Sequence, residues 1–381
     1  MKTEIPNNAL QLNSLITAGS ELVVSLQPVM MRSPDEDEVL VRVDAAPLNP
    51  SDIGLLFGPA DMSKVDVEEA GSTVTLKAPV APAALQAVKG RLDSPQLVGH
   101  EGAGVVVAAG RSEKSQALLG KLVSVAGSGL YAQYQMAKAS NCIAFPEGTK
   151  AEDAASAFVN PLTALGMVQT MRREGHTALV HTAAASNLGQ MLNKICQKDG
   201  IPLVNVVRNE GQVALLKSLG ARYICDSSRS TFAPELTEMI AATGATIAFD
   251  AIGGGKLAGQ ILLAMENAIQ QKSSAYSRYG SNVHKQAYIY GGLNPGPVEI
   301  DRGVGMAWGA GGWLLFSYLE KIGAEETNKL RERVVAEIGT TFKSSYAESI
   351  SLRDMLRPEV IAKYYRRSTG EKYLVVPNVA R

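Results

Sequence analysis

The sequence predicts an α/β protein in which a β-rich first part is followed by a doubly wound parallel sheet. Two observations carry this prediction. The first part contains short apolar runs bounded by glycines, each of strand length, and from about residue 177 candidate strands and helices alternate. Such alternation is typical of a parallel sheet that is covered by helices on both faces. The chain has 381 residues, which corresponds to two domains or three.

Composition excludes several classes of protein. The 37 basic residues balance 37 acidic ones, which argues against a dedicated nucleic-acid binder. Cys142, Cys196 and Cys225 are too few and too widely spaced for a disulfide framework or a cysteine-rich zinc site. The first residues lack the pattern of a signal peptide, and the apolar stretch 303–319 is too short to span a bilayer, so that it predicts a strand and a helix. We therefore expect a cytoplasmic protein with neither nucleic-acid nor membrane partners.

The first part contains candidate strands at residues 38–43, 104–108 and 121–126, the first of which alternates between apolar and polar residues. Residues 60–95 interrupt this pattern, because they mix charged residues, alanine and proline without a steady period. We expect a surface excursion between two elements there, and the alternative is a flap over a pocket.

The second part alternates regularly. A strand at 178–183 precedes a helix whose apolar residues fall on one face, with Gly200 at the expected C-cap. Further strands are expected at 203–207, 223–225, 246–250 and 287–290, and further helices at 213–219, 234–242 and 256–270. The strand 287–290 is the last of this series, so we expect it near a sheet edge, where a second copy could pair to form a homodimer.

The turn from the first of these strands into its helix is a candidate cofactor site. A dinucleotide site needs small residues there, because the backbone must approach a pyrophosphate at the start of a helix. Ala183, Ser186 and Gly189 stand at the spacing of the usual glycines, and only the third is a glycine. The turn alone is equally compatible with a polar connection in which a serine caps the helix.

Arg208 favours the cofactor interpretation. It follows Gly189 by 19 residues and comes directly after the next strand. A site for NAD commonly places an acidic residue there for the ribose hydroxyls, whereas a site for NADP places an arginine for the 2′-phosphate. Glu210 leaves some tolerance for NAD open, and a solvated arginine at a strand end is the plain alternative. Together with the turn, Arg208 predicts binding of NADPH.

Six motifs stand in an order that resembles one known family. They are PLNPSD at 47–52, VGHEGAGV at 98–105, NPLTAL at 160–165, the turn at 182–189, DAIGG at 250–254 and YGG at 290–292. This series resembles the medium-chain dehydrogenase/reductase superfamily, in particular its zinc-independent NADPH:quinone oxidoreductases and enoyl thioester reductases. KYLVVP at 372–377 is similar to the terminal strand of that family.

The resemblance implies a GroES-like β-barrel catalytic domain over residues 1–158, with the insertion at about 60–95. It further implies a Rossmann NADP-binding domain over 159–316, a return to the catalytic domain over 317–381, and a two-fold dimer. The implied cofactor residues are Asn49 and Thr163 beside the nicotinamide, and Ser186, Asn187, Leu188 and Gly189 at the pyrophosphate. Arg208 and Asn209 would bind the adenosine phosphate, and Ile252, Gly253, Tyr290, Gly291 and Gly292 would pass along the nicotinamide ribose.

The residues also argue against a catalytic metal. Zinc-dependent relatives carry a cysteine where this chain has Asn49-Pro50-Ser51, and another near Asn160. Only His100-Glu101 is retained, whereas catalytic zinc needs three protein ligands. We therefore expect no metal and interpret His100 as a structural or pocket residue.

Without a metal, hydride transfer needs a positioned cofactor, a dry cleft and a polarised acceptor. The resemblance implies a small-molecule acceptor, and we expect a quinone or an α,β-unsaturated carbonyl. Enoyl thioester reduction comes second, because that branch has a tyrosine shortly after the NPSD segment and residues 54–61 contain none; the next tyrosine is Tyr131. The third hypothesis is an NADPH-binding protein without turnover. No catalytic residue is identified from the sequence.

Overall fold

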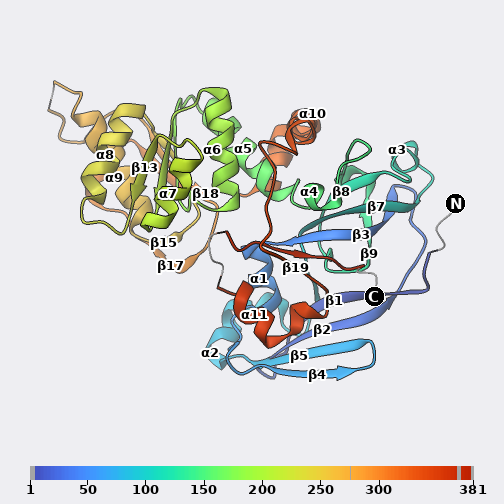
Figure 1. The fold of residues 1–381 in the computed structure, drawn as a ribbon. Helices are drawn as coiled ribbons and strands as arrows, with labels where there is room; N and C mark the ends of the chain where they lie inside the picture. The colour runs from blue at the N-terminus through green and yellow to red at the C-terminus, as the bar shows by residue number, and fades with distance from the viewer. Residues whose placement is uncertain (1–4, 275, 367–369, 379–381) are drawn as a thin grey trace. The chain divides into compact units, whose positions relative to one another are not determined.

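The computed structural model describes residues 5–274, 276–366 and 370–378 (Figure 1). The chain forms two compact units, Met1–Val159 with Val334–Arg381, and Asn160–Arg333. The chain thus returns to the first unit at Val334 rather than at residue 317. The reason lies at the start of α10 (Leu315–Glu337), where the Tyr318 hydroxyl donates to Gln169 over 2.8 Å within the second unit.

The first unit is built from two sheets around one apolar core. One sheet has the strand order β4-β5-β2-β1-β6, and the other has the order β10-β8-β7-β3-β20-β19 with β9 paired to β3. The first sheet consists of β4 (Asp66–Ala70), β5 (Thr73–Pro79), β2 (Glu21–Met30), β1 (Asn8–Ile16) and β6 (Gln96–Leu97). The second consists of β10 (Cys142–Ala144), β8 (Leu122–Ala126), β7 (Glu101–Ala109), β3 (Glu38–Leu48), β20 (Tyr373–Val375), β19 (Glu348–Ile350) and β9 (Tyr134–Lys138). Their buried side chains form a continuous cluster that includes Leu12, Val41 and Val375.

Short helices complete this unit. They are α1 (Pro50–Phe57), α2 (Pro82–Leu85), α3 (Glu113–Gln116), α4 (Ala151–Ala155) and α11 (Pro358–Tyr364), with 3₁₀ turns at Gln86–Arg91, Ala139–Asn141 and Asp354–Leu356. Phe57 of α1 and Tyr364 of α11 stack with ring centroids 6.2 Å apart, so the two ends of the chain share the core.

The interpretation of residues 60–95 as a surface excursion is wrong for its central part. There β4 and β5 form a hairpin, and β5 pairs antiparallel with β2 (Figure 1). Val74, Leu76 and Ala78 are buried in the core, while the residues between them are half-buried. This period of two is the signal of a half-buried strand, and the charged β4 beside it obscures the pattern.

The second unit contains a parallel sheet of six strands in the order β13-β12-β11-β14-β16-β18. The strands are β11 (Leu179–His181), β12 (Leu203–Val207), β13 (Tyr223–Asp226), β14 (Ile247–Asp250), β16 (Lys285–Ile289) and β18 (Trp308–Gly312). The helices are α5 (Val159–Arg173), α6 (Asn187–Asp199), α7 (Glu210–Ser218), α8 (Phe232–Thr243) and α9 (Leu257–Gln270). A small pair, β15 (Gly253–Gly255) and β17 (Asn294–Val298), lies beside the sheet with a 3₁₀ turn at Arg302–Val304. The predicted doubly wound sheet is confirmed.

Apolar side chains cover both faces of this sheet. On one face, Val204 and Ala248 pack with Leu236 of α8 and Leu262 of α9. On the other face, the ring of Phe249 meets Trp313 edge to face, with centroids 5.9 Å apart. Within the described residues, no helix has both the length and the apolar character that crossing a bilayer requires.

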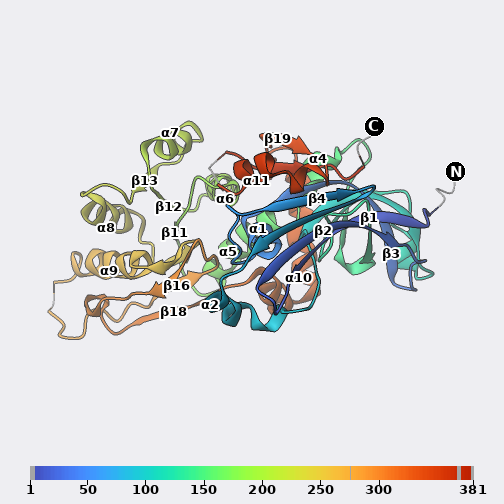
Figure 2. The ribbon, with the colours of Figure 1, turned by 90° about the horizontal axis from the view of Figure 1, so that it is seen from below.

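The strand expected last in the series lies near the edge of the sheet, as predicted, but it is not the edge strand itself. The strand β16 lies inside the sheet, because β18 pairs with it in parallel and forms the outer edge, as Figure 2 shows. The strand and helix expected within residues 303–319 are present as β18 and the start of α10.

Candidate functional site

The turn between β11 and α6 combines an unusual backbone conformation with a capped helix start. Ala183 has a φ of 50°, in the left-handed region that favours glycine. Ser186 is the N-cap of α6, and its hydroxyl oxygen accepts a hydrogen bond of 3.1 Å from the backbone N–H of Gly189. The first N–H groups of a helix lack partners within the helix, so this end of α6 can bind an anion.

Gly189 allows α6 to approach the turn closely. A Cβ atom at this position would lie 2.2 Å from the carbonyl oxygen of Ala184, which is too close for any residue other than glycine. A dinucleotide-binding turn likewise needs a glycine where its helix packs closely. Leu188 is buried, so it can offer only its backbone to a ligand, whereas Ser186 and Asn187 are partly exposed.

Arg208 and Asn209 lie where β12 leads into α7, and both are exposed. The backbone N–H of Arg208 donates to the side chain of Gln212, while no described residue pairs with its guanidinium. Asn209 is the N-cap of α7, because its Oδ1 accepts from the N–H of Gln212 over 3.0 Å. Arg208 therefore has a charged group available for a ligand, and the Oδ1 of Asn209 is already engaged by the helix.

The loop after β14 is organised by one buried carboxylate, that of Asp250. It accepts hydrogen bonds from the hydroxyl of Thr182 over 2.6 Å and from the backbone N–H groups of Ile252 and Gly253 over 3.0 and 3.1 Å. The Thr182 hydroxyl oxygen accepts in turn from the N–H of Ala251. The predicted residues Ile252 and Gly253 are thus tied to the end of β11.

Tyr290 lies at the end of β16, and its hydroxyl is 2.7 Å from Nε2 of His181. Burial lowers the pKa of His181 to about 3, so the imidazole is neutral at ordinary pH. Burial and the charge of Asp250 raise the pKa of Tyr290. The next residue, Gly291, packs closely against Ala251, because a Cβ atom on Gly291 would lie 2.4 Å from the carbonyl oxygen of Ala251. Gly292 has open space on the side where a Cβ atom would stand.

The start of α5 meets the start of α6. The side chain of Asn160 donates a hydrogen bond of 3.2 Å to Oδ1 of Asn187, which places the NPLTAL motif beside the turn at 182–189. Thr163 lies one helical turn further along α5 and is 5% exposed. Together these contacts bring most of the predicted residues of the second unit to the carboxyl edge of its sheet.

Within the first unit, the predicted residue Asn49 is buried at the N-cap of α1. Its side-chain amide donates a 2.9 Å hydrogen bond to Oε1 of Glu101. The other carboxylate oxygen of Glu101 accepts from the backbone N–H groups of Phe158 and Val159 over 3.1 and 2.8 Å. Burial raises the pKa of Glu101, although the charge of Lys372 and these hydrogen bonds oppose the rise.

Lys372 is half-buried and lies near enough to Glu101 for its charge to act on that carboxylate. Its ammonium donates a hydrogen bond of 2.7 Å to the hydroxyl oxygen of Ser156 and lies over the ring of Tyr346. Burial lowers the pKa of Lys372 to about 8, although the negative charges of Glu101 and Asp52 act to raise it. The sequence pattern did not identify Glu101 or Lys372 as part of a site, because they are linked by contacts between distant segments.

His100 and Tyr131 both lie close to the PLNPSD motif. Nδ1 of His100 is 2.5 Å from Oδ1 of Asp52, and this hydrogen bond raises the pKa of His100. Tyr131 is fully buried, and its hydroxyl donates to the carbonyl oxygen of Pro47 over 3.1 Å. Tyr131 is therefore no exposed proton donor.

A metal site would need several ligating side chains close together. In the described ranges, histidine, cysteine, aspartate and glutamate side chains form no group of three that could hold a metal ion.

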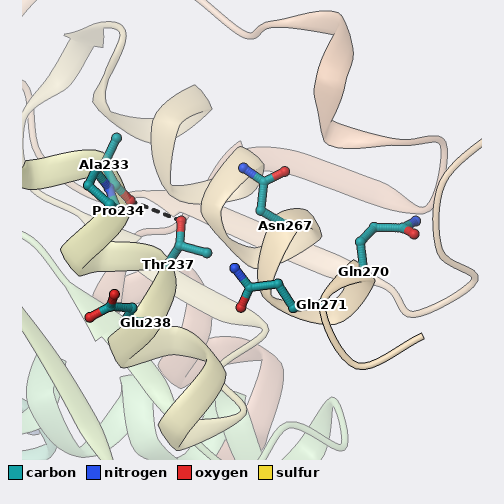
Figure 3. A pocket seen from close by; sticks show the side chains of 7 residues that line it. All are labelled: Ala233, Pro234, Thr237, Glu238, Asn267, Gln270 and Gln271. Carbon is teal, nitrogen blue, oxygen red and sulfur yellow. Dashed lines mark hydrogen bonds between the residues drawn. The ribbon is translucent and has the colours of Figure 1, made fainter. Parts of the chain in front are cut away.

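A hollow of about 500 Å³ lies between α8 and α9 (Figure 3). Its lining is formed by Ala233, Pro234, Thr237, Glu238, Asn267, Gln270 and Gln271. None of the predicted cofactor residues is among them, so this hollow is separate from the candidate site.

Comparison with known proteins connects this geometry to a family. Residues 35–147 match the alcohol dehydrogenase GroES-like domain. Over 286 residues, the chain is 27% identical to mitochondrial enoyl-[acyl-carrier-protein] reductase of Xenopus tropicalis, covering 73% of this chain and 68% of that protein. The Arabidopsis thaliana enzyme of the same name is 25% identical, and the match covers 73% of this chain but only 63% of that protein.

Solved structures extend the likeness to the whole fold. A Mesorhizobium loti protein assigned as an NADPH:quinone reductase has a TM-score of 0.75 at 23% identity, with 98% of this chain and 100% of that chain covered. The Etr1p complex with NADP and crotonyl-CoA has a TM-score of 0.65 at 18% identity, with 97% and 99% covered. The resemblance predicted from the order of the motifs is thereby confirmed for the GroES-like domain and the fold.

Proposed function

We propose that this chain, which has the GroES-like domain and the two-domain fold of the medium-chain dehydrogenase/reductase superfamily, is a zinc-independent oxidoreductase that uses NADPH. The observation that carries this proposal is the turn at 182–189 together with Arg208. The capped start of α6 and the close approach at Gly189 suit the pyrophosphate of a dinucleotide. The guanidinium of Arg208 has no partner among the described residues and suits a 2′-phosphate. When bound, NADPH supplies the hydride.

The residues of the chain would act mainly by binding and orienting. Backbone N–H groups at the start of α6 would hold the pyrophosphate, and Arg208 would form charge-assisted hydrogen bonds with the 2′-phosphate. The buried Asp250 fixes the loop of Ile252 and Gly253 along which we place the nicotinamide ribose. In the first unit, Glu101 orients Asn49, which we propose to lie beside the nicotinamide.

For the acceptor we propose a quinone or an α,β-unsaturated carbonyl. The fold likeness to the Mesorhizobium loti protein supports this choice, and so does the lack of a tyrosine in residues 54–61. Such acceptors take the hydride at carbon, and water can supply the proton to oxygen. An enoyl thioester is the second candidate, because the curated relatives are named as enoyl-[acyl-carrier-protein] reductases.

We also propose that two copies associate. The edge strand is β18 rather than β16, and Trp308 at its start is 37% exposed. An uncovered edge can pair with the same strand of a second copy about a two-fold axis. Light scattering at micromolar concentration should give the mass of a dimer, and the mass of a monomer would contradict this pairing.

Initial rates of NADPH oxidation test the function. A quinone, an enone and a short enoyl thioester are compared side by side, with and without prior exhaustive chelation of metals. Turnover of the quinone or enone that survives chelation supports the proposal, and turnover of the thioester alone supports the second candidate. Binding of NADPH without turnover of any acceptor would instead favour a non-catalytic NADPH-binding protein.

A further inference from the structure

One ion pair at the carboxyl edge of the parallel sheet is not explained by the proposed function. Nη2 of Arg229 lies 2.5 Å from Oε2 of Glu210. Glu210 is the first residue of α7, directly after Arg208 and Asn209, and Arg229 lies in the loop between β13 and α8. These two connections are neighbours in space, because β12 and β13 pair in parallel with Val207 opposite Asp226.

The loop that carries Arg229 is held in place by several hydrogen bonds. The carboxylate of Asp226 accepts from the backbone N–H and the hydroxyl of Ser228 over 3.0 and 2.8 Å. The backbone N–H and the hydroxyl of Ser227 both donate to the carbonyl oxygen of Val207. The backbone N–H of Arg229 donates to the carbonyl oxygen of Asp226. The loop thus places the guanidinium of Arg229 beside the β12–α7 connection.

Glu210 would otherwise oppose the binding of NADPH. An acidic residue after this strand suits the ribose hydroxyls of NAD, whereas it repels the 2′-phosphate of NADP. The carboxylate of Glu210 is exposed but paired with Arg229, whose Nε also lies 3.9 Å from Oδ2 of Asp226. No described residue pairs with the guanidinium of Arg208. The connection therefore offers a positive group to a ligand and has its negative group already paired.

We infer that Arg229 is a specificity-determining residue for NADPH and that it acts by neutralising Glu210. The inference rests on the proposed use of NADPH and adds a second residue to its selection. Arg208 supplies the attraction for the 2′-phosphate, and Arg229 removes a repulsion. Removal of Arg229 should therefore harm binding only as long as Glu210 keeps its charge.

The test is a set of titrations of the whole chain with NADPH and with NADH, using Arg229→Ala, Glu210→Gln and the double variant. Arg229→Ala should raise the Kd of NADPH by about three- to tenfold at low salt, as expected for partly screened repulsion between exposed charges. The double variant should return to within about twofold of the wild type, since an uncharged residue 210 needs no partner. The Kd of NADH should not rise in Arg229→Ala, because an unpaired carboxylate at position 210 suits the ribose hydroxyls, and it should stay within about twofold of the wild type in the double variant. Arg222→Ala is the matched control, because this exposed arginine stands at the opposite end of β13.

Two results would overturn the inference. One is an unchanged Kd of NADPH in Arg229→Ala. The other is a loss that persists in full in the double variant, which would mean that Arg229 does not act through Glu210. Failure of the proposed function is seen separately, because the wild-type protein would then bind no NADPH in the same titration.

Discussion

The side-chain amide of Asn49 donates a 2.9 Å hydrogen bond to the carboxylate of Glu101. The second oxygen of that carboxylate accepts from two backbone N–H groups, which cannot rotate away. The carboxylate thus presents only acceptors, and this determines which end of the Asn49 carboxamide faces Glu101. Glu101 is therefore a positioning residue for Asn49.

Glu101→Gln should reverse the orientation of Asn49. The glutamine oxygen would turn to the two fixed N–H groups, and its NH₂ group would then face the NH₂ group of Asn49. We expect kcat to fall by about tenfold or more while the Kd of NADPH changes little, because about 1.4 kcal/mol of lost alignment in the transition state is a factor of ten. Single-turnover rates and a binding titration measure the two effects.

A second substitution tests the orientation argument itself. In the double variant Glu101→Gln/Asn49→Asp, the carboxylate introduced at position 49 can again accept from the glutamine NH₂, so part of the lost kcat should return. A Glu101→Gln enzyme with the wild-type kcat would show that Glu101 does not position Asn49 for the reaction.

A buried ion pair in the second unit predicts a large effect on stability. Nζ of Lys285 lies 2.6 Å from Oε2 of Glu266, and both side chains are buried. Lys285→Met should lower the free energy of unfolding by about 3–5 kcal/mol in urea denaturation, because it leaves a carboxylate without its charge partner. Lys285→Met/Glu266→Gln removes that charge and should recover much of the loss. Equal losses in both variants would contradict this explanation.

The same pair predicts a dependence of stability on pH. Burial alone would raise the pKa of Glu266, but hydrogen bonds from Gln270, Lys285 and Ser281 outweigh it and lower the pKa to about 2. A pKa below that of the unfolded chain, about 4.3, stabilises the folded state above pH 4.3, and this contribution is lost as the pH falls toward 2. The loss in this window should be smaller in the Lys285→Met/Glu266→Gln variant than in the wild type.

The turn at 182–189 offers two substitutions of opposite sign. Ala183→Gly should raise the free energy of unfolding by about 1 kcal/mol, since glycine adopts a φ of 50° without strain. Gly189→Ala should lower it by about 1–3 kcal/mol, because the new methyl group would overlap the carbonyl oxygen of Ala184. Both are measured by urea denaturation. Ala214→Gly, at an exposed position in the middle of α7, should cost about 1 kcal/mol and controls for the general effect of glycine.

Some elements could be predicted because their local sequence agrees with their environment. The sequence predicts β12 with its observed bounds, since Leu203–Val207 is apolar enough for a strand buried on both faces. Helix α6 has one apolar face and ends at Gly200, which has a φ of 67°. The capping role of Ser186 and the exposed position of Arg208 follow from the same local patterns.

Other features depend on partners that lie far away in the sequence. The sequence of β18, WGAGG, contains three glycines and has no preference for a strand. The strand forms because it pairs with β16. Strand β17 is fully exposed and contains two prolines, so no periodicity marks it. The contact of Asn49 with Glu101 joins positions 52 residues apart, and a local pattern cannot show it.

The revised place of residues 73–79 leads to a further prediction. Leu76→Ala should lower the free energy of unfolding of the first unit by about 2–5 kcal/mol, because Leu76 is fully buried in the core beside β2. Thr75→Ala, on the other face of the same strand, should cost less than about 1 kcal/mol. Similar effects of the two substitutions in thermal or urea denaturation would mean that β5 is not part of the core.

The most direct test of the account is a titration of the wild type and Arg208→Ala with NADPH and with NADH. We expect Arg208→Ala to weaken NADPH binding by about 1.5–3 kcal/mol, the range for a hydrogen bond to a charged group, and to leave NADH binding nearly unchanged. Arg208→Lys should lie between the two, because an ammonium keeps the charge but lacks the planar fork. Equal losses for NADPH and NADH, or no loss for either, would contradict the assignment of Arg208 to the 2′-phosphate.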